Sequence, residues 1–433
     1  MTDRRDVGAA VERRRSYATK VLRALLRASR DGEVATQRAV ESLLAEIGWN
    51  TRAILRRPTT LQTRGEFVHP DEIDDRERLT IVAEYPASNV RKHKSRLLLW
   101  AHPDGMPFDG APGWRNDPFA GTIEDGRMYG WGIADDLSGV AAMIAVAAVV
   151  SDLGTDGSGL VLASTPSKGH ASGVLAALDE LDGIGAGIYL HPAESGNGLA
   201  DIKALAPGMI RLRLVIDGRQ PETAEPNHTL YVDDAVEPIE PMMRLLAALH
   251  EYNAQRARHA NAGSPATMMV GTLSAGESVS RVPPTCEAVI TFSMPPGEDL
   301  ASTCREIART IKRVSSDDSW LVERPPRIDW LFGTTGVETR ADHPLYVAIA
   351  GAVERVTGQV PTYYGGHIAS EIRQPILNHG IPCVGLGPRS GSLTQAGSSG
   401  DEWLDLDDFF RMIAVCAEAA LGWPNSTSEQ TQG

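Results

Sequence analysis

Side chains able to bind a metal ion stand next to two apolar segments of this chain. His102 and Asp104 come directly after the apolar run at residues 97–101. Asp135 precedes a second apolar segment, at residues 138–150. Open α/β sheets build their sites where adjacent strands end, and imidazole and carboxylate groups are ligands of divalent metals. The spacing therefore predicts a metal site at the ends of adjacent strands.

The segment from residue 97 to residue 140 resembles the M20 metallopeptidase family, the aminoacylases and carboxypeptidase G2-like amidohydrolases. The shared pattern is a strand, His-x-Asp, a loop with Gly-Trp and Asp-Pro-Phe, Gly-x-Gly, and Asp-Asp before a helix. In this chain the pattern falls at residues 102–104, 113–114, 117–119, 130–132 and 135–136. The resemblance extends over nearly the whole chain. It also implies a cis peptide bond between Asp135 and Asp136.

In the family that this chain resembles, two metal ions share a bridging Asp. His102 and Asp135 match two ligands of one ion, and His191 stands where the family has an acidic ligand of the same ion; histidine can also bind a metal. This match implies one divalent ion per subunit (zinc, manganese or iron), bound by these three residues in a mononuclear site. The alternative is that the three residues form a hydrogen-bonded core without metal.

The other half of the family's site is substituted. Lys168 stands at the position of the general base, and Gly169 and Ser398 stand at two ligand positions. A protonated Lys cannot accept a proton, but its charge can partly replace a lost dication, so we place Lys168 among the residues that face the substrate. Hydrolysis then needs a different proton acceptor.

Four residues are candidates for catalytic roles. His170 is the first candidate for the base because its ordinary pKa is near neutrality, although it is equally consistent with a helix-start residue that has no chemical role. Glu194 is the second candidate, and Asp104 is expected to orient His102. His228 aligns with a family His that reaches the partner's active site and polarises the scissile carbonyl.

Two further residues belong to a Gly-rich segment that resembles the family's substrate loop. His367 is expected to donate a hydrogen bond to the substrate. Arg373 is expected to bind a substrate carboxylate through a bidentate pair. The alternative for Arg373 is a structural salt bridge to Glu371 or Glu402.

The resemblance, with these residues, implies an M20-like metal-dependent hydrolase that cleaves a C–N bond, in an amide or an aryl or activated amine, of a small-molecule substrate. A second hypothesis is a catalytically inactive, metal-free protein that binds a ligand or a partner. A weaker third hypothesis is oxidation at an iron site, since two His and one carboxylate also suit non-haem iron.

Composition excludes several other classes of protein. The net charge of −14 argues against a nucleic-acid partner. No apolar run approaches the roughly 20 residues of a membrane span, so no membrane partner is expected. The four cysteines lack Cys-x-x-Cys spacing, which is typical of reduced thiols in a cytoplasmic protein.

The pattern of apolar residues predicts an α/β fold, a mostly parallel sheet flanked by helices, with an inserted two-layer α+β domain. We expect the catalytic domain at residues 1–205 and 329–423, and the insertion at residues 206–328. The polar residues 424–433 are expected to be disordered. In the family that the chain resembles, the insertion is a lid used for dimerisation, which implies a homodimer.

Overall fold

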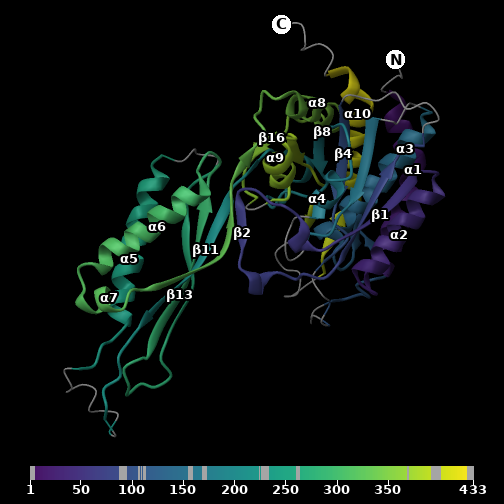
Figure 1. Ribbon diagram of the computed structural model, residues 1–433. Helices are drawn as coiled ribbons and strands as arrows, with labels where there is room; N and C mark the ends of the chain where they lie inside the picture. The colour runs from purple at the N-terminus through teal and green to yellow at the C-terminus, as the bar shows by residue number, and fades with distance from the viewer. Residues whose placement is uncertain are drawn as a thin grey trace. The chain divides into compact units, whose positions relative to one another are not determined.

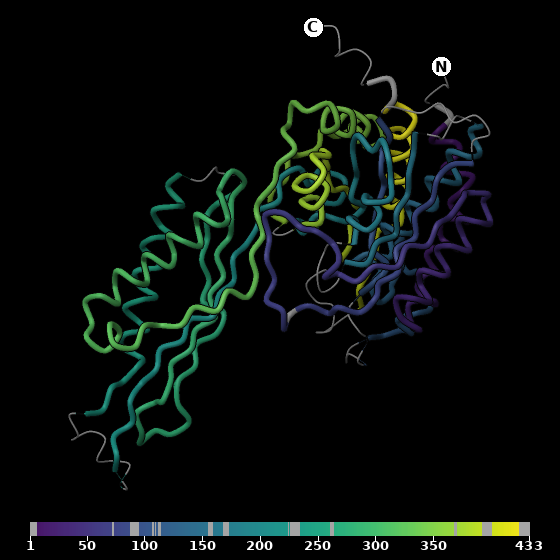
Figure 2. Tube along the Cα trace, viewed as in Figure 1, coloured from purple at the N-terminus to yellow at the C-terminus, as the bar shows by residue number. Residues whose placement is uncertain are grey.

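The computed structural model divides the chain into two compact units. Unit 1 comprises Met1–Arg64, Ile73–Leu205 and Glu338–Gly433, and unit 2 comprises Gly65–Glu72 and Ala206–Val337. Figure 2 shows that unit 1 contains both the purple start and the yellow end of the chain. The structure describes residues 5–86, 95–105, 108, 110, 114–154, 159–167, 173–223, 225, 234–259, 264–367, 370–391 and 401–426.

Unit 1 is built on an eight-stranded sheet, in which parallel pairing surrounds the central strand β4 (Arg96–Ala101). This strand pairs in parallel with β7 (Leu160–Ser164) on one side and with β8 (Ile184–Tyr189) on the other. The edge pair β1 and β3 is antiparallel. The order is β1 (Asn50–Arg56), β3 (Arg78–Glu84), β7, β4, β8, β17 (Cys383–Gly385), β9 (Asp201–Lys203) and β16 (Thr362–Tyr364). The predicted mostly parallel α/β sheet is confirmed.

Helices flank this sheet (Figure 1). Leu97, Leu99 and Ala101 of β4 belong to one apolar core with residues of α1, α3, α8 and α10, whereas α4 lies outside that core and packs against α9. This follows from strand geometry, because successive side chains point to opposite faces. The helices are α1 (Arg5–Ser29), α2 (Glu33–Glu46), α3 (Ser138–Asp152), α4 (Gly173–Leu178), α8 (Pro344–Thr357), α9 (Arg373–His379) and α10 (Leu406–Ser426).

Helix α3 is apolar on every side, and residues 138–150 are all buried, as the sequence predicts. The helical segment Ile133–Asp152 has 20 residues and a mean hydropathy of 1.9, which is long and apolar enough for a membrane span. The expectation that no apolar run reaches that length is therefore wrong. However, 94% of the apolar window is buried inside the protein. A helix buried between layers needs the same composition as a membrane span.

A small four-stranded sheet joins the loop before Asp135 to the segment before α10. Its order is β18 (Ser390–Gly391), β19 (Trp403–Asp405), β6 (Arg127–Tyr129) and β5 (Thr122–Glu124). β19 and β6 are antiparallel, with Trp403 opposite Tyr129. This pairing brings Glu402 next to residues 130–134. The remaining short strands are β10 (Leu205–Ala206) and β15 (Val337–Glu338).

Unit 2 is a two-layer α+β module. Its antiparallel sheet has the order β12 (Met268–Ala275), β13 (Thr285–Met294), β11 (Gly208–Asp217), β14 (Arg327–Thr334) and β2 (Glu66–Val68). Alternate residues of β11, from Ile210 to Ile216, are buried in a core with residues of α5 (Ile239–Ala257) and α6 (Leu300–Ser315). The short helix α7 (Ser319–Glu323) precedes β14.

The bounds of unit 2 differ from the insertion that the sequence predicts. The sequence places its end at residue 328, but β14 pairs with β11 from Arg327 to Thr334, so the unit continues to Val337. It also includes Gly65–Glu72, because β2 pairs with β14 at the edge of the sheet. A single strand that joins from a distant part of the chain leaves little signal in its own sequence.

Gly139 generates a prediction about the packing of α3 against the sheet. A Cβ atom at Gly139 would lie 1.9 Å from the main-chain oxygen of Leu190. We expect Gly139→Ala to lower the free energy of unfolding by about 1–3 kcal/mol, as overpacking does. Urea unfolding measures this change.

The matched control is Gly8→Ala in α1, where an added Cβ meets nothing within 4 Å. There the substitution should raise the free energy of unfolding by up to about 1 kcal/mol, because Ala favours the helix. Equal unfolding midpoints for Gly139→Ala and the wild type would contradict the close approach of α3 to Leu190.

Candidate metal centre

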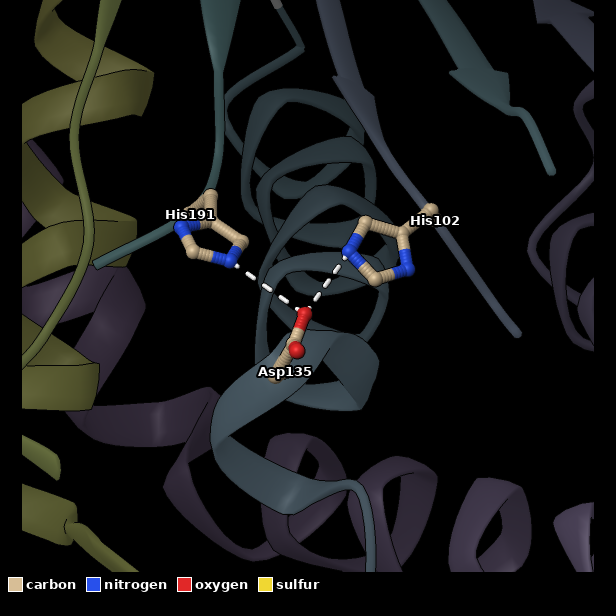
Figure 3. A group of neighbouring side chains, drawn as sticks. All are labelled: His102, Asp135 and His191. Atoms are coloured by element: carbon tan, nitrogen blue, oxygen red, sulfur yellow. Dashed lines mark hydrogen bonds and ion pairs between the residues drawn. The ribbon is translucent and has the colours of Figure 1, made fainter. Parts of the chain in front are cut away.

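Three side chains converge at the carboxyl edge of the parallel strands. His102 follows the last residue of β4, and His191 follows β8 by one residue. Because β4 and β8 are adjacent and parallel, their ends place both imidazoles on the same edge. Asp135 lies in the irregular turn Ile133–Leu137 that leads into α3. Figure 3 shows the carboxylate of Asp135 between the two rings.

The distances between these side chains suit one metal ion bound by all three residues. Nε2 of His102 lies 3.0 Å from Oδ1 of Asp135, and Nε2 of His191 lies 3.3 Å from the same atom. The ligand atoms of the three residues all lie within 4.8 Å of one another. Both His side chains are buried. The structure therefore brings together the three residues that the sequence proposes as metal ligands.

The second nitrogen of each ring faces a main-chain carbonyl. Nδ1 of His102 lies 2.8 Å from the carbonyl oxygen of Asp104, and Nδ1 of His191 lies 2.9 Å from that of Pro192. The Asp104 carboxylate is farther from Nδ1 of His102, at 3.4 Å. When Nδ1–H of His102 donates to this carbonyl, Nε2 of His102 keeps its lone pair for a metal. Asp104 is thus placed to orient His102.

Lys203 is a site residue that the sequence analysis missed. Its side chain is fully buried at the end of β9, and Nζ donates to the Pro192 carbonyl at 2.9 Å. Nζ also lies 2.8 Å from Nδ1 of His191 and 3.1 Å from Nδ1 of His367. Burial lowers the pKa of Lys203, and the charges of nearby carboxylates, Glu194 first among them, oppose that shift.

Lys203 also affects the neighbouring imidazole. Burial lowers the pKa of His191 to about 4, and the positive charge of Lys203 acts in the same direction. His191 is therefore neutral at neutral pH, which is the form that binds metals. The one signal in the sequence is a single lysine within the otherwise apolar residues 202–206. A lysine buried in such a strand needs polar or charged partners.

Glu194 and His367 form a pair beside His191. Oε1 of Glu194 lies 2.5 Å from Nδ1 of His367, and the rings of His367 and His191 are in a T-shaped contact. Burial raises the pKa of Glu194, but the charges of Lys203 and His367 outweigh it and lower the pKa to about 2. Glu194 is thus an ionised partner of His367.

Arg373 is buried rather than open to solvent. Its side chain is 1% exposed, and Nη1 donates to the carbonyl of Ser370 at 3.1 Å. Its charge also acts on the buried carboxylate of Glu371, which accepts a hydrogen bond from the hydroxyl of Ser167. This burial supports the structural alternative for Arg373 over the binding of a substrate carboxylate.

Glu402 fixes the backbone on which Asp135 stands. Its two carboxylate oxygens accept from the main-chain N–H of Gly132, at 2.8 Å, and of Ala134, at 2.6 Å. Burial raises the pKa of Glu402 to about 8, although both N–H groups act against the shift. The peptide bond between Asp135 and Asp136 is cis, as the family resemblance implies.

Several predicted site residues lie outside the described residues. Lys168, Gly169 and His170 fall in residues 168–172, His228 falls in residues 226–233, and Ser398 falls in residues 392–400. Their roles stay predictions from the sequence.

The buried ammonium of Lys203 generates a prediction about stability. We expect Lys203→Met to lower the free energy of unfolding by about 3–5 kcal/mol, because it leaves buried carboxylates without their cation. Denaturant unfolding measures the change. Lys20→Met, at an exposed position of α1, is the control and should change stability by less than about 0.5 kcal/mol. Equal effects of the two substitutions would show that Lys203 carries no such role.

Comparisons with curated proteins find succinyl-diaminopimelate desuccinylases. The enzyme of Methylobacterium radiotolerans is 33% identical over 164 residues, which are 35% of this chain and 39% of that enzyme, under two thirds of its length. The enzyme of Phenylobacterium zucineum is 25% identical over 335 residues, which are 75% of this chain and 82% of that enzyme.

Solved structures share the fold over nearly the full chain. Human carnosine dipeptidase 1 has a TM-score of 0.68 at 14% identity, covering 98% of this chain and 99% of that one. The Bacillus subtilis YXEP protein, described as a dinuclear metal binding peptidase, has a TM-score of 0.60 at 16% identity, covering 94% and 99%. The family model described as peptidase family M20/M25/M40 matches residues 98–422, well over half of the chain. The protein is therefore a member of the M20/M25/M40 family of peptidases.

Proposed function

We propose that the protein is a metal-dependent hydrolase that cleaves a C–N bond in a small molecule and binds one divalent metal ion. The observation that carries this proposal is the convergence of His102, Asp135 and His191 at the edge of the sheet. Two imidazole nitrogens and a carboxylate oxygen form a donor set suited to zinc, manganese or iron. The Asp104 carbonyl that faces Nδ1 of His102 supports this assignment.

A single ion, rather than a pair, is supported by the charges around the site. Lys203 places a positive charge 2.8 Å from Nδ1 of His191, on the side away from Asp135. In a buried environment such a charge disfavours a further cation on that side of His191. Lys168, Gly169 and Ser398 also lack the carboxylate and imidazole groups that the family resemblance implies for the second ion.

The chemistry divides between the metal ion and the protein. When bound, the ion lowers the pKa of a water molecule toward neutrality and so supplies the nucleophile. His102, Asp135 and His191 hold the ion, and Asp104 orients His102. Glu402 fixes the turn that carries Asp135.

For proton transfer we propose the pair formed by Glu194 and His367. A carboxylate that holds Nδ1 of an imidazole orients the ring and stabilises its charged form, which is the role of the carboxylate in hydrolase triads. Glu194 therefore orients His367 instead of acting as the base itself, and His367 accepts and returns the proton. His170 remains the alternative base, and His228 the proposed donor to the scissile group.

The substrate class is an amide or a less usual C–N bond, such as that of an aryl or activated amine. The curated relatives named desuccinylases support C–N cleavage, and the altered base supports a substrate other than an ordinary peptide. A homodimer through the inserted unit and a cytoplasmic location are parts of the same proposal. The convergence of three ligands favours this function over a metal-free binding protein.

The test of the proposed function is a hydrolysis assay with metal-depleted protein. We expect activity toward a panel of N-acyl amino acids and aryl amines to return on addition of zinc, manganese or iron. His191→Ala should lose activity by at least about 100-fold, more than the loss of an outer partner of a metal ligand.

The control for this test is His250→Ala, which removes an exposed imidazole of α5 and should leave activity unchanged. Metal-independent turnover, or full activity of His191→Ala, would overturn the proposal.

A further inference from the structure

An ion-pair network of the buried residues Arg78 and Asp104 and the half-buried Glu33 reaches the candidate metal centre from the N-terminal part of unit 1. Arg78, 8% exposed at the start of β3, lies between two carboxylates. Its Nη2 donates to Oδ2 of Asp104 at 2.8 Å, and its Nε donates to Oε2 of Glu33 at 2.8 Å. Glu33 and Arg78 both precede residue 98, where the match to the family model begins. These ion pairs thus connect a segment outside that match to the loop after β4.

The topology of the sheet explains why Arg78 reaches the site. β3 runs antiparallel to β7, with Ile81 opposite Ser164, whereas β4 and β7 are parallel, with Ala101 opposite Ser164. The first residue of β3 therefore lies at the edge where β4 and β7 end. His102 and Asp104 stand at that same edge.

Helix α2 fixes Glu33, which is at the other end of these ion pairs. Glu33 is in its first turn, and Gln37, one turn later, is fully buried and donates to the carbonyls of Leu79 and Ser164 at 2.7 and 2.9 Å. Residues four apart share one helix face. One face of α2 is therefore anchored both to Arg78 and to the ends of β3 and β7.

Asp104 is held on both sides of its carboxylate. Oδ2 accepts from Arg78, and Oδ1 accepts from the main-chain N–H of Ser167 at 2.9 Å. Its carbonyl oxygen lies 2.8 Å from Nδ1 of His102. A side chain fixed in this way also fixes the carbonyl that orients the imidazole.

We propose that Arg78, anchored by Glu33, is a positioning residue for the metal ligand His102. This inference rests on the proposed function. Arg78 holds Asp104, the Asp104 carbonyl orients His102, and the affinity for a divalent cation therefore depends on a guanidinium that does not touch the metal. Groups that orient ligands typically change metal affinity by about 10–100-fold when they are removed.

The test measures the dissociation constants of zinc and manganese by competition with a chromophoric chelator. We expect Arg78→Met to weaken binding by about 10–100-fold. Arg78→Lys should restore only part of the loss, because an ammonium keeps the charge but lacks the planar guanidinium that contacts both carboxylates. Glu33→Gln should fall between the wild type and Arg78→Met.

The matched control is Arg96→Met. Arg96 starts β4, pairs with Glu84 and donates to the Asp182 carbonyl at 2.9 Å, so it is a part-buried ion pair at the opposite end of β4 from His102. Its loss should leave both dissociation constants unchanged within a factor of about two, because it removes no group that orients a ligand. Unfolding of each metal-free variant is measured in parallel.

The outcomes separate this inference from the proposed function. If the wild type binds neither zinc nor manganese, nor iron in the same competition, the proposed function fails. If the wild type binds metal and folded Arg78→Met binds it equally well, the positioning role is overturned while the proposed function stands. If Arg78→Met does not fold, Arg78→Lys and Glu33→Gln decide, and wild-type affinity in both would overturn the inference.

Discussion

A half-buried carboxylate between two buried imidazoles is the interaction on which the rest of the site depends. Oδ1 of Asp135 lies within 3.3 Å of Nε2 of both His102 and His191, and both rings are out of solvent. Withdrawing a carboxylate from water is costly unless positive charge or hydrogen-bond donors replace the lost water. A divalent cation at the same place would satisfy the carboxylate and both rings at once, and this is why we place the metal there.

Each of the three residues is positioned by polar contacts with a different part of unit 1. Glu402, next to the small sheet, holds the turn that carries Asp135, while Lys203 of β9 and the Pro192 carbonyl fix His191. His102 faces the carbonyl of Asp104. Because these supports come from segments far apart in the sequence, the site forms only when the whole unit is folded.

The sequence predicted His102 and Asp135 from local order along the chain, whereas His191 was predicted only through the family resemblance. A His or Asp directly beyond a short apolar strand, or before a helix, occupies the sheet edge whatever the rest of the fold does. The parallel sheet, the buried helix α3 and the two-layer insertion follow from periodicity in the same way.

Other features depend on tertiary contacts that no local pattern carries. Lys203 and Arg78 are single charges in short strands, and their partners are 11 to 164 residues away for Lys203 and 26 and 45 residues away for Arg78. Three further features also depend on contacts between distant parts of the chain. They are the pairing of Glu194 with His367, the burial of Arg373 and the joining of β2 to the sheet of unit 2. Charged residues in short strands therefore acquire their roles only from the complete fold.

The measurement that tests the account most directly is the metal content per subunit, by plasma mass spectrometry, of protein purified without chelator or added metal. We predict close to one divalent ion per chain, lost in Asp135→Ala. Close to two ions would contradict the mononuclear site and the effect assigned to Lys203. No bound ion, even after incubation with zinc, manganese or iron, would contradict the metal centre itself.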